Sequence, residues 1–229
     1  MEYIYAQELK KYFSVYGFFY DLRLASGETL PCRSVLEIYS KELPTHQESY
    51  RMLFSEKPDA LFIMMNPGSS TPARKNSGIP TLDHNDLSRQ ILNQWLVPAK
   101  PDTTQYQVMR VMLFKKWRHV RVINLSDIRE PKSSAFVKQV KLINDPIHSI
   151  FSPERSSELF QALPLSEKTP IICAWGTNKG LVDLVQLCMD IIPVGRMTGV
   201  QASDSFYYHP LPSLVSKQKE WLMKIKECL

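Results

Sequence analysis

The feature that most restricts the fold is an alternation, from residue 60 onward, of short apolar runs with longer amphipathic segments. The runs are "ALFIMM" at 60–65, "VRVINL" at 120–125, "PIICAW" at 170–175 and "SFYYH" at 205–209. They are rich in β-branched or aromatic side chains and end near Asn, Gly or Pro, which is typical of strands buried on both faces. Helical patterns occupy 85–96, 104–117, 153–163, 177–192 and 215–229. This alternation predicts an α/β fold, a three-layer sandwich with a short, mostly parallel sheet.

Residues 1–55 have weaker periodicity, and we interpret them as an N-terminal α/β extension of a domain that spans 56–229. Within the extension, 5–16 could form a helix, 30–40 alternate like a strand, and 25–31 favour a turn. A chain of 229 residues that is 44% hydrophobic is large enough for one sizeable domain with such an extension.

The four cysteines show no C-x-x-C spacing. We interpret them as reduced thiols, which favours a cytoplasmic location; a zinc site or a disulfide framework is the alternative. The N-terminus lacks the basic start and apolar core of a signal peptide, and no apolar run reaches the ~18–20 residues of a membrane span. We therefore expect no membrane association, and the sequence leaves the oligomeric state open.

The net charge of +5 is concentrated in the middle of the chain. Residues 61–130 hold ten Lys and Arg against five Asp and Glu, and the densest point is "KKWRHVR" at 115–121. Because a basic region attracts phosphates, this stretch offers candidate contacts to nucleic acid. They are Lys115, Lys116, Arg118 and Arg121. The alternative is that these side chains only solvate the end of a helix.

Polar and small residues follow the expected strands. They are Asn66-Pro67-Gly68, Asn124, Trp175-Gly176 and His209-Pro210. Ligands of parallel α/β sheets bind at the carboxyl ends of the strands, so we expect these residues to surround one cleft. The sequence contains no H-E-x-x-H, G-x-S-x-G, P-loop or G-x-G-x-x-G motif, and we expect neither a metal nor a cofactor.

The turn after the first of these strands can hold the Asn66 side chain rigidly. Pro67 pushes the preceding residue into an extended conformation, and Gly68 can adopt a positive φ. The Asn66 amide could then position a water through its oxygen, with Pro67, Gly68 and Ser69 as candidate substrate contacts. The alternative is an ordinary turn in which Asn66 satisfies local backbone groups.

The later strand ends carry the other candidates. His209 can donate to a developing negative charge or shuttle a proton, unless it only bonds backbone at a turn. Asn124 can pair with the edge of a base, or it can simply cap its strand. Gly176 precedes a helix start, where a polar ligand can approach backbone N–H groups. We interpret Trp175 as a packing residue.

Several short motifs occur in a particular order. They are "YRML" (50–53), "MMNPGSS" (64–70), "IPTLD" (79–83), "INL" (123–125), "CAWG" (173–176) and "HPL" (209–211). This ordered set resembles domain of unknown function 1643, a bacterial and phage family, across about residues 50–213. More distantly, the N-P-G, N-L and H-P-x-P motifs resemble the single-strand-selective and mismatch-specific branches of the uracil-DNA glycosylase superfamily.

The glycosylase resemblance implies a fold of that type and hydrolysis of an N-glycosidic bond in DNA or in a nucleotide. By this resemblance, Asn66 would hold or activate the hydrolytic water, and Asn124 would read the flipped base. His209 would donate to the base as it leaves with negative charge. The loop from Pro210 to Ser213 would press into the DNA.

The sequence departs from this pattern directly after Asn66-Pro67-Gly68. Such glycosylases place an aromatic residue there to stack on the base, whereas Ser69, Ser70 and Thr71 follow here. The last motif reads H-P-L-P rather than H-P-S-P. A second hypothesis is therefore a non-catalytic module that binds nucleic acid or a nucleotide on the same fold.

Overall fold

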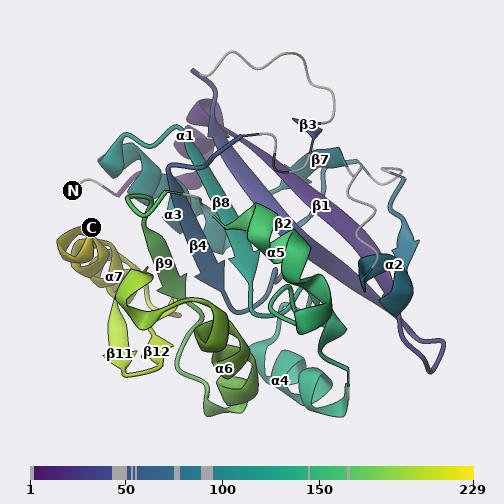
Figure 1. Cartoon of the computed structure of the whole chain (residues 1–229). Helices are drawn as coiled ribbons and strands as arrows, with labels where there is room; N and C mark the ends of the chain where they lie inside the picture. Colours follow the sequence, from purple (N-terminus) through teal and green to yellow (C-terminus); the bar gives the residue numbers. More distant parts are fainter. Residues whose placement is uncertain are drawn as a thin grey trace.

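The structure, a computed structural model, has one large mixed sheet at its centre with helices on both faces (Figure 1). It describes residues 3–42, 51–52, 54, 56–74, 78–88, 95–143, 145–163 and 166–229. Within these residues the strand order is β10-β9-β4-β8-β2-β1-β7-β3, with β5 paired to β7 and β6 to β1. The strands are β1 (Phe13–Arg23), β2 (Thr29–Ser40), β3 (Arg51–Met52), β4 (Ala60–Met64), β5 (Thr71–Pro72), β6 (Thr81–Leu82), β7 (Trp95–Lys100), β8 (His119–Asn124), β9 (Ile171–Ala174) and β10 (Met197–Thr198).

Half of the sheet is parallel. β4 lies between β8 and β9, and Ile63 is in register with Ile123 on one side and Cys173 on the other. β10 continues this half in parallel beside β9. Every residue of β4, β8 and β9 is buried, which confirms the expectation of strands covered on both faces. Their carboxyl ends therefore lie side by side.

The other half of the sheet is antiparallel. β2 pairs with β8, and β1 with both β2 and β7, all in antiparallel register. Apart from the short parallel pair of β1 and β6, the expected parallel arrangement therefore holds for β4, β8, β9 and β10, and the α/β sheet is mixed. Residues from the expected extension 1–55, such as Tyr20 and Val35, share a hydrophobic core with Ile63 and Ile123.

Helices cover the sheet on both faces, and alternate residues of β4 point into two different cores. Leu61 and Ile63 pack in the core that contains residues of α4, α5 and α6, whereas Phe62 and Met64 pack in the core that contains residues of α1, α3 and α7. The α-helices are α1 (Ala6–Tyr12), α2 (His84–Ser88), α3 (Thr103–Lys115), α4 (Ser133–Leu142), α5 (Ser156–Ala162), α6 (Val182–Ile191) and α7 (Val215–Cys228). Short 3-10 turns are η1 (Pro146–His148), η2 (Pro153–Arg155), η3 (Lys179–Leu181) and η4 (Val194–Arg196).

Three expected elements differ in the structure. The helix expected at 5–16 ends at Tyr12, and β1 begins at the next residue, Phe13. The helix expected at 85–96 is α2 as far as Ser88; residues 89–94 lie outside the described residues, and β7 begins at Trp95. The last expected strand is shorter: β12 (Phe206–Tyr207) pairs with β11 (Gln201–Ser203) and reaches the end of β9 through one bridge between Gly176 and Tyr207.

Candidate functional site

A hollow of about 400 Å³ lies at the carboxyl ends of β4 and β9. Its lining includes Asn66, Gly68 and Ser69 after β4, Gly176 after β9, and His209 from the loop before α7. Segments that are far apart in the sequence therefore meet here, as the parallel strands predict. The volume is within the range of pockets that bind small molecules.

The amide of Asn66 is held in one orientation. Its Nδ2 donates to the backbone oxygens of Ile128, at 3.1 Å, and Glu130, at 2.8 Å. Both amide hydrogens are thus used, and among the described residues nothing donates to its Oδ1. The predicted turn is confirmed: Gly68 has a φ of 60°, and the N–H of Ser70 donates to the carbonyl of Pro67. Asn66 satisfies backbone groups with one end of its amide and keeps an acceptor at the other.

The imidazole of His209 is a neutral donor. Its Nδ1 accepts a hydrogen bond from the backbone N–H of Leu211 at 3.2 Å, so the ring proton lies on Nε2. Loss of hydration lowers the pKa of His209 to about 4. At neutral pH the ring can therefore donate from Nε2 without carrying a charge.

The loop after His209 is fixed by two glutamines. Gln107 Nε2 donates to the carbonyl of Pro210 at 2.8 Å, and Gln218 Nε2 donates to the carbonyl of Pro212 at 2.9 Å. Pro210 is buried, and Ser213 is exposed beyond the lining of the hollow. These bonds hold the loop against α3 and α7.

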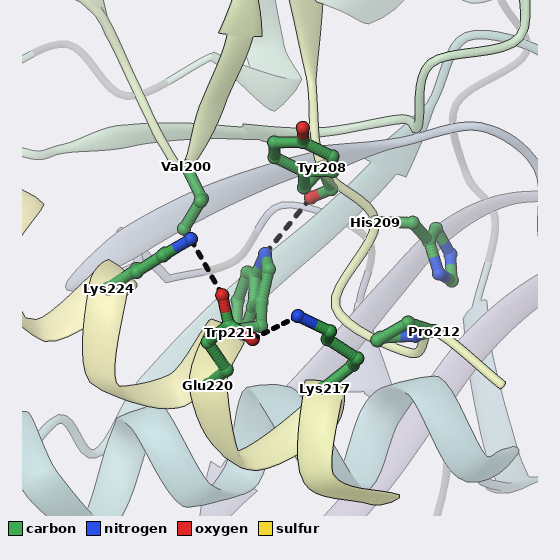
Figure 2. A pocket seen from close by; sticks show the side chains of 8 residues that line it. All are labelled: Val200, Tyr208, His209, Pro212, Lys217, Glu220, Trp221 and Lys224. Carbon is green, nitrogen blue, oxygen red and sulfur yellow. Dashed lines mark hydrogen bonds and ion pairs between the residues drawn. The ribbon is translucent and has the colours of Figure 1, made fainter. Parts of the chain in front are cut away.

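A second hollow, of about 250 Å³, borders His209 and α7 (Figure 2). Glu220 forms ion pairs there with Lys217 and Lys224, at 2.7 and 2.8 Å, and Trp221 Nε1 donates to the carbonyl of Tyr208. Figure 2 shows the His209 ring apart from these ion pairs. The charged groups of α7 therefore do not set the protonation of His209.

Asn124 supports the site from below and does not line it. Its side chain is completely buried. In the orientation that satisfies both ends of the amide, it donates to the backbone oxygen of Asn66 at 3.3 Å and accepts from Arg33 Nη2 at 3.1 Å. The prediction that Asn124 reads a base is therefore wrong for this hollow, because no part of its side chain is accessible.

Gly176 lines the hollow, but its backbone N–H is already used. It donates to the carbonyl of Tyr207 at 2.8 Å, so this N–H is not open to a ligand, and the approach to the N–H groups of the following helix start stays a prediction. Its φ of 92° explains the glycine. Pro67 is buried, whereas Ser69 is exposed at the rim. Trp175 is completely buried, which confirms its packing role.

The basic stretch 115–121 lies at the opposite end of the sheet from the hollow. The residue before α3, Asp102, lines the hollow, and Lys115 ends the helix thirteen residues later. That length corresponds to about 20 Å. Lys115 Nζ donates to the carbonyl of Leu229 at 2.7 Å, while Lys116 and Arg118 are exposed. These side chains cannot contact the same few nucleotides as His209.

Arg121 was predicted to bind nucleic acid because of its basic neighbours, and this prediction is wrong. The side chain is 2% exposed and forms an ion pair with Glu37. A guanidinium that is buried and paired inside a sheet cannot reach a phosphate.

Two residues in or beneath the hollow, Asp102 and Arg33, were not among the predicted site residues. Asp102 lines it and caps α3, because Oδ1 accepts from the N–H groups of Thr104 and Gln105. Arg33, on β2, lies beneath and contacts Asn124. The "DTTQ" pattern at 102–105 is a capping-box signal that could have placed the helix start. No local signal shows that this carboxylate faces Gly68.

Among the described residues, no three His, Cys, Asp or Glu side chains come together in a way that could hold a metal ion. In the same part of the chain, every helix is too short or too polar to cross a bilayer. No family model, no curated protein and no solved structure matches this chain. The family resemblances of the motifs therefore stay predictions.

Proposed function

We propose that this chain is a uracil-DNA-glycosylase-like protein that hydrolyses the N-glycosidic bond of a base in DNA or in a nucleotide. The observation that carries the proposal is that Asn66 and His209 line one hollow. One presents a fixed amide oxygen and the other a neutral N–H donor. Helices on both faces of the sheet support the three-layer fold that the resemblance implies.

The two side chains suit the two ends of the reaction. When the bond between C1′ and the base nitrogen breaks, the sugar gains positive charge and the base gains negative charge. Nε2–H of His209 can stabilise the departing base, and Oδ1 of Asn66 can orient a water toward C1′. A single donor aimed at developing charge is worth on the order of 3 kcal/mol in such sites.

The test is release of base from oligonucleotides and free deoxynucleotides that contain uracil, hypoxanthine, or oxidised or alkylated bases. Abasic sites are detected by alkaline cleavage, and free bases by chromatography. We expect Asn66→Ala and His209→Ala each to lower the rate about 100–1,000-fold while the protein stays folded. If the unchanged protein releases no base from any of these substrates, the proposal is wrong.

A second candidate is a non-catalytic module that binds nucleic acid or a nucleotide in the same hollow. The exposed Ser69 favours it, because it stands where glycosylases of the resembled branches place an aromatic residue. Gel shifts at 50 and 200 mM salt test this candidate. Binding led by phosphates must weaken steeply with salt, whereas salt-independent binding would indicate a small ligand.

A further inference from the structure

We propose that Asp102 is the catalytic base of this hollow and that Arg33 is the positioning residue that keeps its carboxylate charged. The inference rests on the proposed function and adds to it two residues that neither the motifs nor the resemblance include. Three observations support it: the chemistry that Asn66 lacks, the contact between Asp102 and Gly68, and the surroundings of Arg33.

The first observation concerns the proton of the attacking water. The amide of Asn66 can orient a water but cannot accept its proton. Nδ1 of His209 is occupied by the N–H of Leu211, and Nε2 carries the ring proton. Among the described residues that line the hollow, Asp102 is the one carboxylate. It is therefore the acceptor that the chemistry requires.

The second observation is the direction of the Asp102 side chain. Its Oδ1 is fixed by the N–H groups of Thr104 and Gln105, at 2.9 and 3.1 Å, which leaves Oδ2 to face elsewhere. A Cβ built on Gly68 would lie 3.1 Å from this Oδ2. The other carboxylate oxygen thus lies against the turn that carries Asn66, where a Cβ at position 68 would be in tight contact with it.

The third observation is the guanidinium of Arg33, which is 1% exposed. Its Nε and Nη1 have no hydrogen-bond partner among the described residues, and Nη2 contacts Asn124. A buried charge with so few hydrogen bonds is costly unless other charges balance it. The charged groups that act on Arg33 are Asp102, Asp127 and Arg129.

Of these acids, Asp127 already has another cation as its partner, while its Oδ1 is buried and has no hydrogen-bond partner among the described residues. Its Oδ2 pairs with Arg155 at 2.6 Å and accepts from Tyr20 at 2.8 Å. Arg33 is the charged group that acts on Asp102, and the other groups that act on it are the hydrogen-bond donors of Thr104 and Gln105. Burial raises the pKa of Asp102 and Arg33 opposes this rise, which suits a base that must be strong yet ionised near neutrality.

The step balances as follows. The bond between C1′ and the base nitrogen breaks, and its electron pair goes to the base, which Nε2–H of His209 stabilises. The water oxygen bonds to C1′ while its proton passes to Oδ2 of Asp102. Asp102 then releases this proton to solvent, and the base takes one up.

The test uses the full chain and the substrate that it cleaves fastest. Asp102→Asn keeps the size of the side chain and an oxygen that caps α3, because Asn caps helices as well as Asp does. We expect it to remain folded and to lose about 100–10,000-fold in rate. Unchanged cleavage by Asp102→Asn would overturn this inference and leave the proposed function intact, whereas no cleavage by the unchanged protein would remove both.

A second measurement does not depend on the folding of Asp102→Asn. Without Arg33, the carboxylate is harder to ionise, so Arg33→Met should move the acidic limb of the pH–rate profile to higher pH. Arg23→Met, which removes an exposed arginine outside the lining of the hollow, should leave the profile unchanged. An unmoved acidic limb in Arg33→Met would overturn the inference.

Discussion

Arg121 Nε lies 2.6 Å from Glu37 Oε1 in the centre of the sheet, and both side chains are almost completely buried. Nη1 of Arg121 also donates to the carbonyl of Ala162, and Nη2 to that of Glu56. The other Glu37 oxygen lies 2.6 Å from Nε2 of His119. Arg121, which its basic neighbours predicted to bind nucleic acid, therefore forms a structural ion pair that joins β8 to β2.

Without Arg121 the protein should unfold more easily, because Glu37 would remain a buried charge without its main partner. We expect Arg121→Met to lower the free energy of unfolding by about 3–5 kcal/mol, measured by urea denaturation. The matched control is Arg118→Met, which should change it by less than about 0.5 kcal/mol, since Arg118 is exposed. Equal stability of the two variants would contradict the pairing.

Asn66 should not tolerate replacement by aspartate, although aspartate is the stronger base. Both hydrogens of Nδ2 donate to backbone carbonyls, and in Asn66→Asp a carboxylate oxygen would face those carbonyls instead. We expect a loss of about 2–4 kcal/mol in the free energy of unfolding. Ser69→Asp, which adds an acid to the exposed side of the same turn, should have little effect on stability. An Asn66→Asp protein as stable as the unchanged one would mean that these two hydrogen bonds contribute nothing.

Substitutions at two glycines with positive φ can distinguish the effect of backbone strain from an effect on the geometry of the site. Gly68 (φ 60°) faces Asp102, whereas Gly27 (φ 87°) has nothing within 4 Å of a built Cβ. Both alanine variants should lose about 1–2 kcal/mol of stability, which thermal unfolding can measure. Only Gly68→Ala should also lower base release, by at least tenfold, because its methyl group displaces the carboxylate. Similar activity in the two variants would contradict this arrangement.

The imidazole rings of His148 and His209 should both titrate far below an ordinary histidine. Burial lowers the pKa of each to about 4, so proton NMR should place both midpoints near pH 4 rather than 6.5. The variants His148→Gln and His209→Gln assign the two signals. A titration midpoint near pH 6.5 for His209 would contradict the conclusion that its imidazole is a neutral donor held at a lowered pKa.

The same shift makes stability depend on pH. An unfolded histidine binds a proton below pH 6.5, whereas native His148 stays neutral down to about pH 4. The contribution of His148 to the free energy of unfolding is therefore present above pH 6.5 and is lost as the pH falls toward 4. For this buried ring the full contribution is on the order of 3 kcal/mol. Urea midpoints at pH 7 and pH 4.5 should therefore differ less in His148→Gln than in the unchanged chain.

Three strands of the parallel half, β4, β8 and β9, could be predicted because their runs are mostly apolar and each is followed by a turn, whereas β10 was not predicted. Periodicity likewise predicted α3, α6 and α7. It did not predict β7, because the apolar residues of 85–96 also fit helical spacing, although Trp95–Lys100 is a strand. Nor could it show that β2 joins β8, since pairing between strands about eighty residues apart has no local signal.

The site was predicted in part for the same reason. Asn66 follows the buried strand β4, so topology brings it to this edge, whereas His209 reaches the same edge because β12 meets Gly176 through one bridge, which has no local signal. Asn124 also follows a strand, but the neighbouring turn and Arg33 cover it, and no pattern within its own segment reports that burial. Asp102 belongs to a helix cap, which the sequence signals, yet its proximity to Gly68 arises only from tertiary packing.

The antiparallel pairing of β2 with β8 has a consequence for the smallest unit that can fold by itself. A fragment that begins at residue 56 would lack β2 and would expose unsatisfied N–H and C=O groups of β8 between His119 and Val122, which invites aggregation. It would also lack Arg33, the buried cation beneath the hollow. Any shortened version intended for biochemistry must therefore retain the first hairpin.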